Sequence, residues 1–203
     1  MFNYEEAFSR NIGWVTKEEQ QKLRNTKVAI GGLGGVGGDH TIVLARLGIG
    51  NFHISDLDDY DVANFNRQAG ANMSTLGKAK AAVMEETVRG INPEATIKNF
   101  DSGINEDNLD EFLEGVDIYV DSLDIFVLEI RRKVFRRCYE KGIPTITAAP
   151  MGMGTAFLVF MPGKMSFDEY FAIVDAAANA SEEEKAKIFN DNIIRFVIGV
   201  SPS

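Results

Sequence analysis

The chain has 203 residues, of which 45% are hydrophobic and 25% are charged, as in an ordinary globular domain. Its 30 acidic and 21 basic residues give a net charge of −9 without any long basic run, which argues against nucleic-acid binding through phosphate contacts. The single cysteine, Cys138, excludes an internal disulfide and a zinc site built from several cysteines of one chain. No apolar stretch is long enough to cross a membrane and the first residues do not resemble a signal peptide, so we expect a cytoplasmic protein.

The predicted elements alternate between helices and short apolar strands. A helix is expected over 16–24, with Thr16 as its N-cap and Glu19 completing a capping box. The strand "KVAIGG" and a helix ended by Gly48 follow, then the strand "NFHISD" and a helix over 77–91. Further on, the pattern predicts strands over 95–100, 116–122, 143–149 and 155–160, and helices over 105–115 and 127–142. This alternation predicts an α/β fold, a Rossmann-like, mostly parallel sheet with helices on both faces.

The pattern changes after Pro162. We expect residues 1–162 to form the main domain, with an N-terminal helical arm, and residues 163–203 to be a helical segment at the end of the same domain. In the second segment, Ser181 is expected to cap a helix with glutamates in its first turn. The final "VIGVSPS" resembles a strand running into a loop, which indicates a fragment of a longer chain.

The glycine-rich stretch "GGLGGVGG" indicates a nucleotide site. Gly32, Gly34 and Gly37 lie between a strand and a helix, where they permit a tight turn, close approach of a phosphate and close packing of helix on strand. The helix N-terminus supplies free N–H groups for an anion. Asp56 follows 19 residues after Gly37 (56 − 37 = 19), where a carboxylate can accept hydrogen bonds from ribose hydroxyls. These features leave NAD and ATP open, and a tight turn without a ligand is the alternative.

The following residues favour a triphosphate. Arg67 and Lys80 supply a guanidinium and an ammonium, Asn64 supplies an amide, and Asp124 follows an apolar strand where a carboxylate can hold Mg²⁺ against phosphates. Each has a structural alternative: a loop-shaping Asn64, a surface ion pair of Arg67, a solvated Lys80 and a helix-capping Asp124.

Several motifs together resemble the ubiquitin-activating-enzyme superfamily, in its ThiF/MoeB/HesA branch. They are "KVAIGGLGGVGG", "ISDLDDYDVANFNRQ", "LGKAK", "INPEATI" and "VDSLD", and the resemblance covers about residues 10 to 160. It implies a homodimeric adenylyltransferase that uses ATP and Mg²⁺ to activate a carboxylate, commonly the C-terminus of a ubiquitin-like or sulfur-carrier protein.

The resemblance also implies roles for particular residues. Gly32, Gly34 and Gly37 would bind phosphate, Asp56 would bind the ribose, and Asp124 would bind Mg²⁺. The phosphates would be contacted by Asn64, Arg67 and Lys80. Arg10, in "FSRNI", matches an arginine that reaches into the site of the other subunit, which implies composite sites.

Departures from the family pattern keep alternatives open. The zinc-binding C-x-x-C pairs are absent, no cysteine follows the last strand, and Ile125 replaces the asparagine of the D-x-x-D-N motif. Adenylation is therefore the expected activity, without thiol transfer. The alternatives are a relative of the tRNA threonylcarbamoyl-adenosine dehydratases, a catalytically silent scaffold subunit, and an NAD-dependent oxidoreductase, which only the glycines and Asp56 favour.

Overall fold

The computed structural model describes residues 1–124, 126–151 and 153–171, together with positions 173, 181, 183, 184, 187, 188 and 191. The chain divides into two compact units, Met1–Leu123 and Asp124–Ser203, which are described one after the other. No helix in these described residues has the length and apolar character that crossing a membrane requires.

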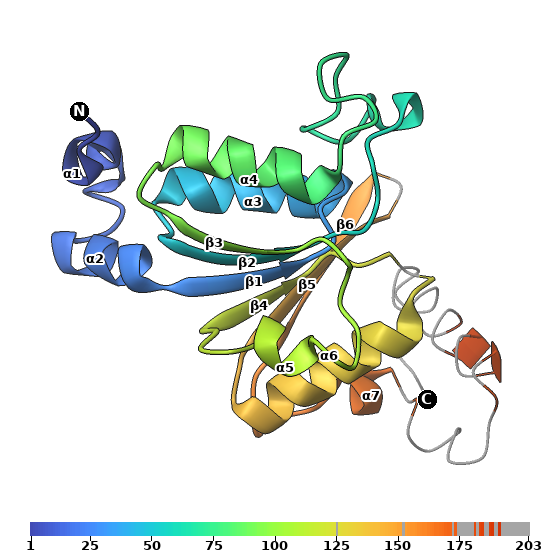
Figure 1. Cartoon of the computed structure of the whole chain (residues 1–203). Coiled ribbons are helices and arrows are strands. Elements are labelled where there is room, and N and C mark those ends of the chain that lie inside the picture. Colours follow the sequence, from blue (N-terminus) through green and yellow to red (C-terminus); the bar gives the residue numbers. More distant parts are fainter. Residues whose placement is uncertain are drawn as a thin grey trace. The chain divides into compact units, whose positions relative to one another are not determined.

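The first unit is built on four parallel strands in the order β3-β2-β1-β4 (Figure 1). They are β1 (Lys27–Gly31), β2 (Asn51–Ser55), β3 (Thr96–Phe100) and β4 (Ile118–Asp121). Val28 of β1 is in register with Phe52 of β2 and with Ile118 of β4. Because the strands are parallel, their carboxyl ends meet at one edge of the sheet, where such folds bind ligands.

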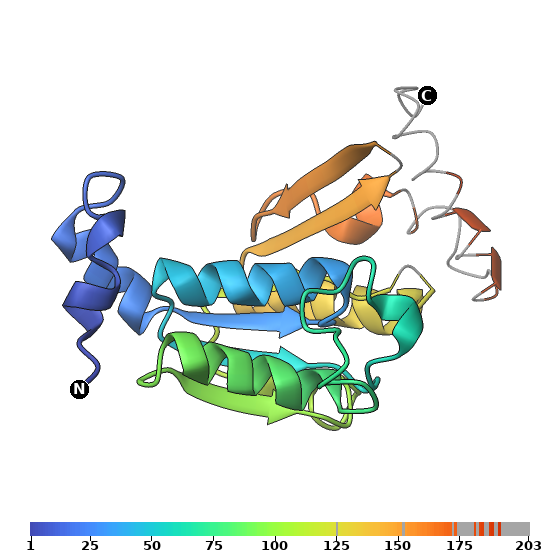
Figure 2. The same ribbon diagram turned by 90° about the horizontal axis from the view of Figure 1, so that it is seen from above.

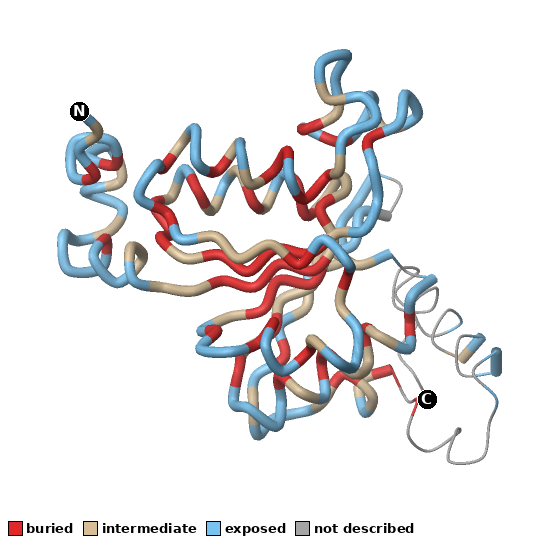
Figure 3. The backbone as a smooth tube through the Cα atoms, viewed as in Figure 1, coloured by how far each residue is buried: buried red, intermediate tan, exposed pale blue. Residues whose placement is uncertain are grey.

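Helices cover both faces of this sheet. Helices α3 (Gly35–Leu47) and α4 (Lys80–Ile91) lie side by side on one face (Figures 1 and 2). Alternate strand residues point to that face and form the core, which includes Val28, Ile30, Phe52, Ile54, Met84 and Val88. On the other face, the ring of Phe112 in α5 (Leu109–Phe112) lies 6.4 Å from the ring of His53. Strands β1, β2 and β4 are mostly buried (Figure 3), and the predicted α/β, Rossmann-like fold class is confirmed.

Helix α2 (Lys17–Asn25) begins with the predicted capping box. The Thr16 hydroxyl accepts the Glu19 N–H at 3.1 Å, and the Glu19 carboxylate accepts the Thr16 N–H at 2.8 Å. The predicted end of α3 is confirmed as well, because Gly48 takes a left-handed conformation with φ of 93°.

The N-terminal arm contains α1 (Tyr4–Ala7) and the 3-10 turn η1 (Ser9–Asn11). It is fastened to the C-terminal end of α3. Asn11 Nδ2 and Gln20 Nε2 each donate to the Leu47 carbonyl at 3.0 Å, and the Tyr4 hydroxyl donates to the Gly48 carbonyl. These bonds satisfy carbonyls that a helix end leaves without intrahelical partners.

Two predicted helices are shorter than expected. The segment 105–115 is helical only over Leu109–Phe112, because Asn105 Oδ1 accepts N–H groups of Asp107 and Asn108 in a turn that replaces the first helical turn. Helix α4 begins at Lys80 rather than at residue 77, since residues 77–80 pair instead with residues 58–60.

The second unit contains α6 (Leu128–Lys141) and the strands β5 (Thr145–Met151) and β6 (Gly154–Phe160), which form an antiparallel pair. The short helix α7 (Phe167–Tyr170) follows, capped by Ser166. Phe135 of α6 packs against Phe160 and Phe167, with ring centroids 5.4 and 4.3 Å apart. Cys138 is fully buried in α6.

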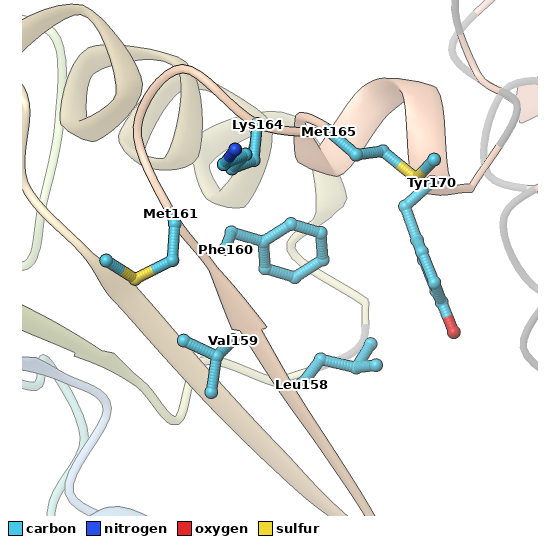
Figure 4. A pocket seen from close by; sticks show the side chains of 7 residues that line it. All are labelled: Leu158, Val159, Phe160, Met161, Lys164, Met165 and Tyr170. Atoms are coloured by element: carbon cyan, nitrogen blue, oxygen red, sulfur yellow. The ribbon is translucent and has the colours of Figure 1, made fainter.

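A cavity of about 320 Å³ lies beside β6 and α7 in this unit (Figure 4). It is lined by Leu158, Val159, Phe160, Met161, Lys164, Met165 and Tyr170. Farther along, the Ser181 hydroxyl accepts the Glu184 N–H at 3.3 Å, as predicted for a helix cap. Most of the predicted helical segment 163–203 lies outside the described residues, and the domain boundary at residue 162 stays a prediction.

Candidate nucleotide site

The glycine loop connects β1 to α3 at the carboxyl edge of the first unit. Gly32 has a φ of +86°, and a Cβ added there would collide with the Ser122 carbonyl. A Cβ on Gly37 would collide in turn with the Gly32 carbonyl. The two glycines are therefore required for backbone to pack on backbone, as the sequence predicts.

Gly34 is in a different situation because its side of the loop is open. A Cβ built there would meet only the Gln68 side chain, with Nε2 at 3.5 Å. Gly34 is also the N-cap of α3 and supplies no side-chain cap. Within the described residues, the first turn of α3 therefore has no side-chain cap at its N-cap position, and a helix N-terminus of this kind can bind phosphate.

Asp56 directly follows β2 and holds the glycine loop in place. Its Oδ2 accepts the Leu33 N–H at 2.7 Å, and its Oδ1 accepts the Asp58 N–H at 2.9 Å. Each carboxylate oxygen has a second lone pair, so the group can still accept a ribose hydroxyl.

Residues 61–76 form a loop that extends beyond the carboxyl ends of the strands (Figure 1). The 3-10 turn η2 (Val62–Asn64) begins it, and Asn64 Oδ1 accepts the Asp61 N–H at 2.9 Å, so Asn64 shapes the turn. The exposed Arg67 donates from Nη1 to the Ala63 carbonyl at 2.8 Å. Its own carbonyl lies close to Gly35, 3.1 Å from where a Cβ would stand. The structure thus brings the Arg67 segment against the glycine loop.

Lys80, the first residue of α4, is buried and forms an ion pair. Its Nζ lies 2.9 Å from Asp58 Oδ2, with side-chain exposures of 7% for Lys80 and 61% for Asp58. A solvated Lys80 is therefore excluded as an interpretation. The backbone N–H of Asp58 donates in turn to the Asp56 carboxylate. The ion pair with Asp58 therefore places Lys80 at the same edge of the sheet as the glycine loop.

Asp124 belongs to the second unit and Arg10 to the N-terminal arm. Asp124 begins the second unit, and its Oδ1 accepts the Phe126 N–H at 3.0 Å in the turn that precedes α6. Arg10 is exposed on η1. Because η1 is fastened at the C-terminal end of α3 and the glycine loop lies at its N-terminal end, the 13 residues of α3, about 20 Å, lie between them.

A family model described as the ThiF family matches residues 8–201. The chain belongs to the ThiF family. This assignment confirms the resemblance that the glycine loop and the "NFNRQ" segment indicated.

Individual relatives agree with this assignment. A tRNA threonylcarbamoyladenosine dehydratase from Haemophilus influenzae is 35% identical over 74% of this chain and 57% of its own length. The sulfur carrier protein ThiS adenylyltransferase from Escherichia coli is 26% identical over 73% of this chain and 58% of its own length. A solved structure of the E. coli tRNA threonylcarbamoyladenosine dehydratase in complex with ATP matches with a TM-score of 0.67 and 30% identity, over 70% of this chain and 58% of that one. The chain thus spans little more than half the length of these ThiF-family relatives.

Two polar residues close to the sequence-predicted candidates are not themselves among those candidates. Asp58 forms the ion pair with Lys80. The acidic run "DLDD" directly after a strand is the sequence pattern that could have indicated it. Tyr60 is almost fully buried, and within the described residues its hydroxyl has no hydrogen-bond partner. Burial, together with the charge of Asp56, raises the pKa of Tyr60 to about 12, so the phenol stays protonated at neutral pH.

Proposed function

We propose that this chain is the nucleotide-binding part of an enzyme that uses ATP to adenylate a carboxylate. The observation that carries the proposal is the open N-terminus of α3 at Gly34, with the Arg67 segment packed against the loop and Lys80 tied to Asp56 through Asp58. Three separate segments thereby gather anion-binding groups at one edge of the sheet, which suits a triphosphate.

The chemistry proposed for the site is charge neutralisation and positioning. A carboxylate that attacks the α-phosphorus of ATP meets like charge, so cationic side chains around the phosphates lower the barrier. Arg67 and Lys80 would supply these charges, and Asp56 would hold the ribose. Asn64 would add an amide contact to the phosphates. A general base is unnecessary because the attacking carboxylate is already ionised.

Mg²⁺ fits the proposed site as a companion of the phosphates. Among the residues the structure describes, there is no cluster of three or more histidine, cysteine or acidic side chains that could hold a metal alone. Mg²⁺ commonly binds through one or two carboxylates with substrate phosphates and water, and the exposed carboxylate of Asp124 would supply one of them. When bound, Mg²⁺ would offset negative charge on the phosphates.

The activated carboxylate has two candidate sources. Relatives named for acting on the sulfur carrier ThiS and on SAMP support a ubiquitin-like or sulfur-carrier protein as the partner. The similarity to tRNA threonylcarbamoyladenosine dehydratases supports instead a carboxylate on modified tRNA. The net charge of −9 disfavours the tRNA. The remaining alternatives are a silent scaffold and an NAD-dependent oxidoreductase, the latter favoured only by the glycines and Asp56.

We also propose a homodimer with composite sites. Arg10 lies at the far end of α3 from the glycine loop of its own chain, as the anchoring of η1 to Leu47 requires. Arg10 can therefore serve a nucleotide site only in a second copy of the chain.

The test of the nucleotide is a calorimetric titration of the purified chain with ATP and Mg²⁺ and, separately, with NADH. We expect ATP to bind with Mg²⁺ present and NADH to show no heat of binding. Lys80→Met should weaken ATP binding about tenfold, because it removes one charged hydrogen bond to phosphate. Lys17→Met, which removes an exposed lysine from the first turn of α2, is the matched control and should bind ATP as the wild type does.

Binding of NADH without ATP would support the oxidoreductase. If neither nucleotide binds, the scaffold would be supported and the proposed adenylation would be contradicted.

A further inference from the structure

Asp58 holds the first residue of α4 at two points. Its carboxylate lies 2.9 Å from Lys80 Nζ, and its carbonyl accepts the Lys80 backbone N–H at 3.0 Å. The second bond belongs to a short pairing of residues 58–60 with residues 77–80, which includes the Asp59–Ala79 bridge. Both the position of α4 and the direction of its first side chain therefore depend on this residue.

Asp58 is also connected to the glycine loop. Its N–H donates to Asp56 Oδ1 at 2.9 Å, while Asp56 Oδ2 accepts the Leu33 N–H of the loop at 2.7 Å. A continuous set of hydrogen bonds thus runs from the loop that would hold phosphate, through the acid that would hold ribose, to Lys80. Such networks keep charged groups oriented before a ligand arrives.

We propose that Asp58 is a positioning residue, which fixes the Lys80 ammonium for contact with the phosphates of the nucleotide. This inference rests on the proposed ATP site. A lysine side chain loses rotamer entropy when it is held in one conformation. Asp58 imposes that order in advance, and an ammonium bound to one carboxylate oxygen keeps two further N–H groups for phosphate.

The alternative role for Asp58 is competition with phosphate for Lys80, and it predicts the opposite change in ATP binding. If Asp58 only competed with phosphate for Lys80, its removal would free the ammonium and would remove a negative charge from the site. ATP would then bind more tightly rather than more weakly.

The test is a double-mutant cycle on the dissociation constant of ATP with Mg²⁺, measured by calorimetry on the full chain. The variants are Asp58→Asn, Lys80→Met and the pair together. Asp59→Asn is the matched control, since Asp59 is an exposed neighbouring acid in the same backbone pairing. Thermal unfolding without nucleotide checks the folding of each variant.

We expect Asp58→Asn to weaken ATP binding about fivefold and Lys80→Met about tenfold. The double variant should be no weaker than Lys80→Met alone, because Asp58 acts through Lys80. Asp59→Asn should bind as the wild type does.

A merely structural role of Asp58 would weaken binding further in the Lys80→Met background, and that result would overturn the proposal. Tighter binding by Asp58→Asn would overturn it as well, since it identifies a competitor. A wild-type chain that binds no ATP would overturn both this proposal and the proposed function. ATP binding that responds to Lys80→Met but not to Asp58→Asn would overturn only the positioning role.

Discussion

The glycines of the nucleotide loop have different structural roles. Gly32 and Gly37 are surrounded by backbone, so each is needed for the packing of β1, α3 and the end of β4. Gly34 faces open space bounded by the Gln68 amide, so its missing side chain leaves room at the helix N-terminus. The packing of the loop and its capacity to admit a phosphate therefore depend on different residues.

Replacing Gly37 with alanine should lower the free energy of unfolding by about 1–3 kcal/mol, because the new methyl group overlaps the Gly32 carbonyl. Gly90→Ala is the matched control, since Gly90 lies in α4, is exposed and has no atom within 4 Å of the added Cβ. It should raise the free energy of unfolding by about 0.5–1 kcal/mol. Urea denaturation of both variants measures the two changes, and equal effects would contradict this account of the loop.

At the scale of elements, helix ends with local chemical signals were predictable. Thr16 and Glu19 define the start of α2, and Gly48 defines the end of α3, because capping bonds and left-handed glycines involve only neighbouring residues. The start of α4 was predicted wrongly, since it depends on pairing with residues 58–60 that are distant in the sequence. Hydrophobic periodicity carries no information about such a pairing.

In the candidate site too, only features that depend on residues close together in the sequence were predictable. The glycines and Asp56 were identifiable because a strand, a turn and a helix place them in order along the chain. The partner of Lys80 was not identifiable, because Asp58 lies 22 positions before Lys80 and the intervening residues contain a loop whose path no local pattern determines. The burial of Lys80 follows from that path, and it excludes the solvated lysine that the sequence left open as the alternative to a phosphate contact.

A substitution of Gln20 tests how the N-terminal elements are anchored to the end of α3. Gln20 is buried, and its Nε2 donates to the Leu47 carbonyl while its Oε1 accepts from Asn11. Gln20→Met keeps the volume and removes the bonds of Gln20 to Leu47 and Asn11, which should cost about 1–3 kcal/mol. Hydrogen–deuterium exchange should accelerate in residues 4–16. The neighbouring exposed Gln21, changed to methionine, is the control, and equal exchange in both variants would contradict the anchoring role.

At the scale of the whole molecule, the position of Arg10 in the fold bears on the proposed dimer. This chain matches the ThiF family model over residues 8–201, a range that includes Arg10 and the glycine loop. A rigidly fastened arm keeps Arg10 away from the glycine loop of its own chain. The proposed dimer gives this residue a function, since the arm of one copy would complete the site of the other.

This arrangement predicts complementation between two defective variants. Arg10→Ala and Lys80→Met should each bind ATP weakly as homodimers, because both sites of each dimer lack one cation. After unfolding and refolding of an equimolar mixture, a heterodimer has one doubly defective site and one intact site. Random pairing then restores about one tight ATP site for every four chains. Calorimetry of the refolded mixture measures this stoichiometry, with refolded wild-type chain as the control. Absence of tight sites, in a mixture whose mass shows dimers of twice 22.4 kDa, would mean that Arg10 does not act across the interface.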